Sequence, residues 1–141
     1  MTDEPTTRVR DAMITEPRSL PATATAREAG EVLTPAEVRA VYVVGDEGAL
    51  VGVVTRKTLV AKVVARGLHP NAVRVAEIAE KPYYTIDADT PLDEAFRFLE
   101  EEDAERVPVV HEGRLVGVVS RAVLQRRLAE DEEPAEPELD A

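Results

Sequence analysis

Nearly the same order of apolar and polar residues occurs twice in the chain, 65 or 66 positions apart. Leu50–Arg56 reads LVGVVTR, and Leu115–Arg121 reads LVGVVSR. Upstream of these segments, the apolar run Val41–Val44 matches Val107–Val110, and the one-residue difference in offset falls in the turn between them. Hairpin turns tolerate such changes in length. The pattern therefore predicts an internal repeat with a two-stranded hairpin in each copy.

An amphipathic helix pattern precedes each hairpin. Apolar residues recur at i, i+3, i+4 and i+7 from residue 92 onward, which predicts a helix over Leu92–Glu101. Thr90 is the expected cap of this helix, and Pro91 is expected in its first position. The segment Ala26–Leu33 repeats the same face 66 positions earlier with smaller side chains. We expect Pro35 to end that first helix.

Each copy is thus predicted to contain a strand, a helix, a two-stranded hairpin and a second helix. The expected strands are 19–20, 40–44, 50–55, 84–86, 106–110 and 114–119, and the expected helices are 26–33, 56–65, 92–101 and 121–129. Val41–Val44 and Val51–Val54 are continuously apolar, which is typical of strands covered on both faces. A unit of about 55–60 residues buries too little apolar surface to be stable alone. We therefore expect an α/β (α+β) fold in which two tandem βαββα repeats pack together with pseudo-two-fold symmetry.

The expected repeats are residues 8–66 and 75–129, joined by a connector at 67–74. Residues 1–7 are expected to be a flexible N-terminus. From residue 130 to 141 there are seven acidic residues and no basic one. Such a stretch without apolar periodicity is typical of a disordered, solvated tail.

These residues resemble a known family, the CBS domain, and two copies in tandem resemble a Bateman module. The resemblance is carried by Val107–Val110 followed by Leu115–Ser120, by the matching first-copy segment that ends at Thr55, and by Val9–Met13. Val75–Ile78 fits the pattern more weakly. The likeness covers roughly residues 8–129 and is to stand-alone CBS pairs, including those of the mycobacterial hypoxic-response type.

The resemblance implies a ligand such as AMP, ATP or another adenosyl compound in the clefts between the repeats. Thr55 and Ser120 put a hydroxyl at a helix start, where it can cap the helix or meet a phosphate. Arg56 and Arg121 follow immediately and can supply donors to the same anion. Tyr84 can stack on a base, or it can simply pack in the core or at a strand edge.

One departure from the family pattern leaves two functions open. Nucleotide-binding CBS repeats place an Asp three residues after the hydroxyl, where its carboxylate accepts the ribose hydroxyls; Thr58 and Val123 stand there in this chain. Losing such a charge-assisted bond costs about 1.5–3 kcal/mol, or roughly 10- to 150-fold in affinity. The first function is a non-enzymatic regulatory sensor that binds a small ligand and signals to a protein partner. If one cleft alone binds the ligand, the cleft at Thr58 is expected to be that one. The alternative is a ligand-free structural or protein-interaction module whose nucleotide sites have degenerated.

The composition of the 141 residues narrows the possible functions. The formal net charge is −11, which repels a nucleic-acid backbone. Because there is no cysteine, disulfides and thiolate sites are excluded, and His69 and His111 have no carboxylates at ligand spacing in the sequence, so no metal site is predicted. No recognisable set of nucleophile, base and orienting group indicates an enzyme. Without a signal peptide pattern or a membrane-spanning apolar run, a cytoplasmic protein without membrane contact is expected.

A homodimer is also expected. The first helix has Ala26, Ala29 and Gly30 where the second copy has larger side chains. Because cores seldom leave large voids, we predict that this small face makes a close helix contact across the dimer.

Overall fold

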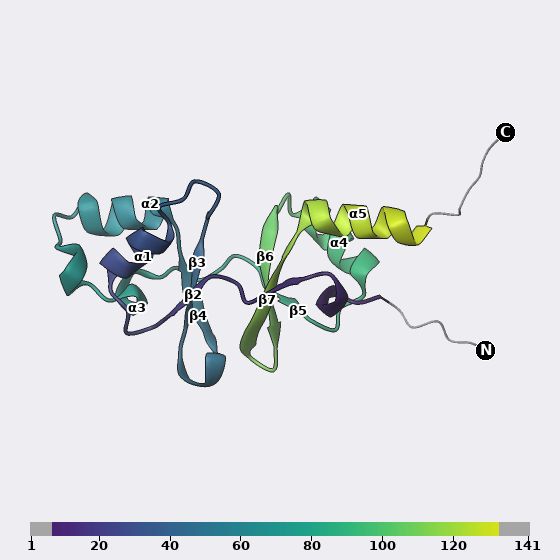
Figure 1. Ribbon diagram of the computed structural model, residues 1–141, viewed down its shortest axis with the longest axis horizontal. Coiled ribbons are helices and arrows are strands. Elements are labelled where there is room, and N and C mark those ends of the chain that lie inside the picture. Colours follow the sequence, from purple (N-terminus) through teal and green to yellow (C-terminus); the bar gives the residue numbers. More distant parts are fainter. Residues whose placement is uncertain (1–6, 133–141) are drawn as a thin grey trace.

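Two small β-sheets meet at the centre of the molecule, and helices lie on their outer sides (Figure 1). The computed structural model describes residues 7–132. One sheet has the strand order β2-β3-β4 and the other has the order β1-β7-β6-β5. The strands are β1 (Ile14–Thr15), β2 (Ser19–Pro21), β3 (Val41–Val44), β4 (Leu50–Val54), β5 (Ile86–Asp87), β6 (Arg106–His111) and β7 (Arg114–Ser120). The helices are α1 (Ala26–Val32), α2 (Arg56–Leu59), α3 (Val75–Ile78), α4 (Leu92–Glu101) and α5 (Arg121–Glu132).

Short helical turns complete the repeats. Three 3₁₀ turns lie at Val9–Asp11, Asp46–Gly48 and Pro70–Ala72, and α2 continues into a π-helical segment at Val60–Val64. None of the helices within residues 7–132 has the length and apolarity needed to cross a membrane.

The two hairpins are built alike, which confirms the predicted duplication. In the β3–β4 hairpin Val43 is paired with Gly52, and in the β6–β7 hairpin Val109 is paired with Gly117. Both hairpins have a register irregularity directly after that valine. A short strand pairs in parallel with each hairpin, β2 with β3 and β5 with β6. The α/β fold of two βαββα repeats expected from the sequence is therefore confirmed.

Each repeat contributes its first segment to the core of the other repeat. Val9 and Ala12, near the start of the chain, are buried in the second core together with α4 and α5. Conversely, α3 packs into the first core through Ile78, which is 3% exposed. We call residues 9–18 and 75–84 the crossing segments, because each leads from one core into the other repeat.

Two glycines allow the crossing segments to lie directly against the hairpins. A Cβ at Gly52 would lie 2.9 Å from the carbonyl oxygen of Glu80, and a Cβ at Gly117 would lie 2.8 Å from that of Ile14. Ordinary side chains do not tolerate contacts this short. Both glycines are therefore required by the packing of the two repeats.

Some predicted boundaries are wrong. Thr90 does not cap α4, because Pro91 has an extended ψ of 142° and is itself the residue that precedes the helix. The strand expected at 84–86 is formed by Ile86–Asp87 instead, and Tyr84 lies before it with its ring edge-on to Phe98, the ring centroids 5.3 Å apart. The last helix, α5, continues to residue 132 rather than 129.

Burial of the strands also differs in part from the expectation. Val41 and Val43 are buried as predicted, but Val51 is 44% exposed, so β4 is not covered on both faces along its whole length. The expectations for the two chain ends concern residues 1–6 and 133–141, which lie outside the described residues.

The small face of α1 packs within its own repeat. Ala26 and Ala29 are buried in the first core. A Cβ at Gly30 would be 3.8 Å from Cδ1 of Leu59, so this position faces the α2 helix of the same chain. The predicted contact across a dimer at this face is therefore replaced by a close contact between α1 and α2.

Candidate functional site

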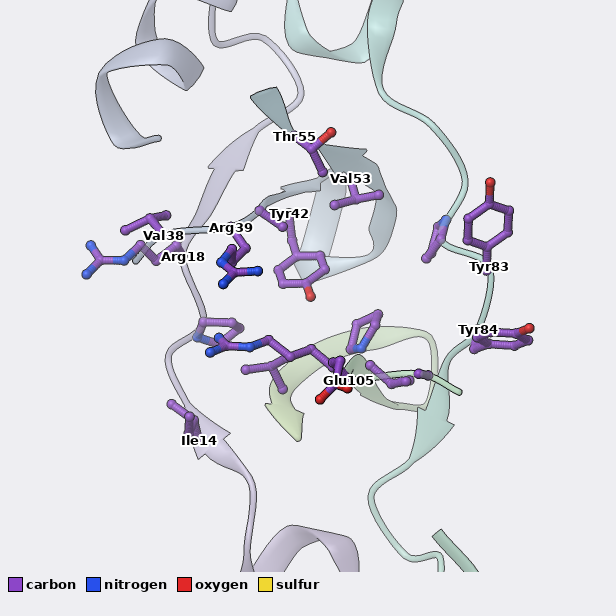
Figure 2. Close-up of a pocket in the computed structure, with 18 of the residues that line it drawn as sticks. Ile14, Arg18, Val38, Arg39, Tyr42, Val53, Thr55, Tyr83, Tyr84 and Glu105 are labelled. Atoms are coloured by element: carbon purple, nitrogen blue, oxygen red, sulfur yellow. The ribbon is translucent and has the colours of Figure 1, made fainter. Parts of the chain in front are cut away.

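A cavity of about 1000 Å³ lies between the two repeats, where the crossing segments pass (Figure 2). Its walls come from Ile14, 16–18 and 82–84 of the crossing segments and from the residues that lead into β3 and β6. Small-molecule sites typically have volumes of about 300–1,000 Å³. Its size and position make this cavity the candidate ligand site.

Three arginines line the cavity without an ionic partner. Arg18 precedes β2, Arg39 precedes β3, and Arg106 is the first residue of β6. Within residues 7–132 none of them forms an ion pair, and none donates a side-chain hydrogen bond. Planar guanidinium groups bind phosphate and carboxylate groups through paired hydrogen bonds. This cluster of arginines therefore provides the chemistry to hold an anion.

Tyr42 adds an aromatic ring to the same wall. The residue is 8% exposed, and its hydroxyl points into the cavity (Figure 2). Burial raises the pKa of Tyr42, while the charge of Arg106 acts in the opposite direction. A neutral phenol in this place can both donate a hydrogen bond and present its ring to a ligand.

Two further tyrosines, Tyr83 and Tyr84, belong to the second crossing segment and lie on the opposite side of the cavity from Arg18 (Figure 2). Tyr83 is 95% exposed. The Tyr84 hydroxyl donates a 2.9 Å hydrogen bond to Oε1 of Glu102, which raises the pKa of this tyrosine. The carboxylate thus fixes Tyr84, whereas Tyr83 is accessible at the edge of the cavity.

Three of the five acidic residues that line the cavity, Glu102, Asp103 and Glu105, have partners. Arg121 donates to Glu105 at 2.5 Å and to Asp103 at 3.4 Å, and the hydrogen bond with Glu105 raises the pKa of the guanidinium. Glu105 stands 66 positions after Arg39, so the two repeats place opposite charges at equivalent positions of the wall. Glu16 and Glu37, which also line the cavity, form no ion pair within residues 7–132, so free carboxylates accompany the free arginines there.

The six residues predicted from the sequence do not lie together. Thr55 and Tyr84 line the cavity, whereas Arg56, Thr58, Ser120 and Arg121 are not part of its walls. Instead, an amino group of Arg56 donates to the carbonyl oxygens of Leu33 at 2.5 Å and Pro35 at 2.7 Å, where α1 ends.

The predicted hydroxyls serve as helix caps. Thr55 Oγ1 accepts a hydrogen bond from the Thr58 N–H at 3.3 Å, and Thr58 Oγ1 accepts one from the Thr55 N–H at 3.0 Å. Thr58 is 1% exposed and also lies 3.4 Å from a carboxylate oxygen of Glu80. At the start of α5, Ser120 Oγ accepts from the Val123 N–H at 3.2 Å. Both helix starts are therefore stabilised by side chains, as the sequence indicated.

Arg18, Arg39, Arg106 and Tyr42 were not among the residues predicted from the sequence. A signal for them was present, because each arginine stands at or just before the start of an apolar strand. Recognising it required knowing that these strand starts meet at the contact between the repeats.

The comparison with protein families agrees with this architecture. The CBS domain matches the chain twice, at residues 9–65 and 75–130. The chain belongs to the CBS-domain family. It is a tandem CBS pair, and the two matched segments cover almost all of the described residues.

Individual relatives support the same assignment. Hypoxic response protein 1 of Mycobacterium tuberculosis is 35% identical over 102 residues, which are 72% of this chain and 71% of that protein. A crystal structure of Hypoxic Response Protein I with two coordinated zinc ions has a TM-score of 0.72 at 32% identity and covers 86% of this chain and 98% of that one.

Two other solved CBS pairs contain adenosyl ligands. The CBS domain pair of protein MJ0100, in complex with 5-methylthioadenosine and S-adenosyl-L-methionine, has a TM-score of 0.65 at 26% identity and covers 91% of this chain and 100% of that one. CBSX2 in complex with AMP has a TM-score of 0.70 at 24% identity, with 89% and 98% of the chains covered. At this identity, the similarity to CBSX2 shows a shared fold and nothing more.

Proposed function

We propose that this CBS pair is a non-enzymatic regulatory module that binds a small anionic ligand, an adenosine nucleotide or a related adenosyl compound, in the cavity between its repeats. The observation that carries the proposal is the group of three arginines, Arg18, Arg39 and Arg106, which have no ionic partner within residues 7–132 and line a cavity of about 1000 Å³. Unpaired guanidinium groups gain energy when an anion replaces water as their partner.

The aromatic residues suit the other end of such a ligand. Tyr42 and Tyr83 offer rings on which a purine can stack, and the Thr55 hydroxyl and the Tyr84 ring are within the same walls. Arg56, Thr58, Ser120 and Arg121 act one step away from the ligand, because they hold the helix starts and the acidic wall in place. Adenosyl ligands in two solved CBS pairs support this ligand class.

Ligand binding in the cavity can change how the two repeats are arranged. Both crossing segments contribute to the walls of the cavity and to the core of a repeat. A ligand that prefers one spacing of the walls therefore shifts how the two repeats pack and changes the surface offered to a protein partner.

The test is isothermal titration of nucleotide-stripped protein with AMP, ATP, S-adenosylmethionine, NAD and guanine nucleotides. We expect one of these ligands to bind, and we expect Arg39→Ala and Arg106→Ala each to weaken it by about 10- to 150-fold, the value of a charge-assisted hydrogen bond. Arg27→Ala is the matched control, because Arg27 lies on the exposed side of α1, outside the cavity, and pairs with Glu31 at 3.4 Å.

Loss of affinity in the cavity variants but not in Arg27→Ala supports the proposed site. Equal affinity in all variants would show that the ligand binds elsewhere, and the absence of binding heat for every compound in the panel would contradict the proposed ligand class.

A second candidate function is a protein-interaction module without a small ligand. It is favoured by the state of the predicted motif residues: Arg56 and Arg121 are occupied by contacts within the chain, and Thr58 is buried beside Glu80. This candidate predicts that none of the compounds in the titration panel binds. It also predicts that a protein partner binds the chain equally well with and without these compounds.

We also propose that the module forms a homodimer through the helix that begins at α2. Val60, Val64 and Leu68 follow at intervals of four residues and are 57%, 70% and 42% exposed. Residues 8–66 contain nine basic and seven acidic residues, whereas 67–132 contain eight basic and fifteen acidic ones. This difference in charge favours a second copy in head-to-tail orientation, with the first repeat of one protomer against the second repeat of its partner.

A further inference from the structure

A histidine and two aspartates meet at the ends of two strands of the second repeat. Asp87 ends β5, Asp89 lies two residues further on, and His111 ends β6. Parallel pairing of β5 with β6 brings these strand ends together, although 22 to 24 residues separate the histidine from the aspartates in the sequence. His111 Nδ1 lies 3.7 Å from Asp87 Oδ1 and 4.0 Å from Asp89 Oδ2. Sequence spacing alone does not indicate this cluster.

The imidazole nitrogen in this cluster lacks a partner. Nδ1 of His111 is shielded from solvent and makes no hydrogen bond with any residue in 7–132. A buried polar atom without a partner costs about 1–3 kcal/mol, so such atoms are uncommon. The other ring nitrogen, Nε2, faces a carboxylate oxygen of Glu112 at 3.7 Å. The ring therefore directs its buried nitrogen toward the aspartates and its second nitrogen toward an acidic group.

The fold itself does not require these residues. The equivalent positions in the first repeat, 66 residues earlier, are Pro21, Thr23 and Gly45. The same parallel strand pairing is present there, since Pro21 is paired with Val44. None of the three side chains can bind a metal as an imidazole or a carboxylate does. The cluster is thus specific to the second repeat.

We propose that Asp87, Asp89 and His111 bind a divalent transition-metal ion, through one oxygen of each aspartate and Nδ1 of the histidine. The three ligand atoms all lie within 4.8 Å of one another, so side-chain shifts of about 1 Å or less bring them to the separation of about 3.4 Å that ligands have around a tetrahedral Zn²⁺. One imidazole and two carboxylates form a donor set that suits Zn²⁺, with water in the remaining position. Arg10 donates to the other oxygen of Asp89 and holds this carboxylate in orientation.

This site is separate from the cavity between the repeats, because none of its three ligands lines that cavity. The outcome of a metal-binding test at this site therefore does not depend on whether the proposed nucleotide function is correct.

The test is isothermal titration of the full chain with Zn²⁺, and separately with Mg²⁺, in a buffer that does not bind metals. We expect one Zn²⁺ per chain and no comparable binding of Mg²⁺, because Mg²⁺ prefers oxygen ligands. His111→Ala and Asp87→Asn should each weaken Zn²⁺ binding by about 10-fold or more. The matched control is His69→Ala, since His69 is the only other histidine and lies in the exposed connector.

A spectroscopic measurement identifies the ligand atom. In ¹⁵N NMR spectra of the imidazoles, Zn²⁺ should shift Nδ1 of His111 and leave the ring of His69 unchanged. Circular dichroism of each variant shows whether it is folded, and Asp87→Asn serves as the milder change if His111→Ala unfolds. Equal Zn²⁺ affinity in wild type, His111→Ala and Asp87→Asn, or no Zn²⁺ binding by the wild type, would overturn the proposal.

Discussion

Single glycines determine how closely the crossing segments approach the hairpins. At Gly52 a methyl group would meet both Cβ of Ala79 and the backbone oxygen of Glu80 at 2.9 Å. Neither neighbour is the flexible end of a long side chain, so the backbone itself has to move. We expect Gly52→Ala to lower the free energy of unfolding by about 1–3 kcal/mol, as overpacking does in other cores. Urea unfolding followed by circular dichroism measures this change.

Gly30 provides the matched control for this prediction. Its added methyl group would meet only Cδ1 of Leu59, at an ordinary 3.8 Å. Because alanine is preferred over glycine inside a helix, Gly30→Ala should be neutral or stabilising by about 0.5–1 kcal/mol. If both variants had the same stability, the proposed role of Gly52 in close approach would be wrong.

At the scale of elements, the exposed face of the helix that begins at α2 has no cover among the described residues. Val64 is 70% exposed at the centre of this face. If the face forms the homodimer contact, Val64→Asp should convert the dimer to a monomer, because burying an unpaired carboxylate at an interface is unfavourable. Sedimentation velocity at several protein concentrations measures the association.

The control for this experiment changes an exposed residue away from the helices of both repeats. Arg114→Ala at the start of β7 should leave sedimentation unchanged. A wild-type chain that sediments as a monomer at all concentrations would refute the dimer.

Most elements could be predicted because their signals are local. The repeated segment ending at Thr55 or Ser120 marks a hairpin followed by a capped helix, and both caps are present. The strand β1 was missed because two residues, Ile14 and Thr15, form it only by pairing with β7 of the other repeat. No local pattern distinguishes such a pair from a loop.

At the scale of the whole molecule, the exchange of crossing segments joins the two cores. Ile78 belongs to the second repeat by sequence and to the first core by packing. We therefore predict that both repeats unfold in a single transition. Ile78→Ala in the first core and Leu99→Ala in the second should each lower that same transition, by about 2–5 kcal/mol.

Differential scanning calorimetry tests this prediction, because a single cooperative transition gives equal calorimetric and van't Hoff enthalpies. Two separate transitions, with only one of them moved by Ile78→Ala, would mean that the repeats unfold independently.

The candidate site was less predictable than the fold because its walls come from segments that are far apart in the sequence. The sequence motif pointed to Arg56 and Arg121, which follow the hydroxyls directly, yet both contact groups of their own surroundings. The arginines that line the cavity, among them Arg39, are brought there by contacts between the repeats. A local sequence motif is enough to predict where a helix starts, whereas the residues that line the cavity are determined by tertiary packing.

The reciprocal placement of Val9 and Ile78 also bears on how such a chain can originate. A polypeptide holding one copy of the βαββα unit could complete its core only by pairing with a second molecule that donates its leading segment. Fusing two copies in tandem makes this pairing intramolecular, so that it no longer depends on protein concentration. Once joined, the copies can diverge, and one can acquire ligand groups that its sibling lacks, as at His111 and Gly45.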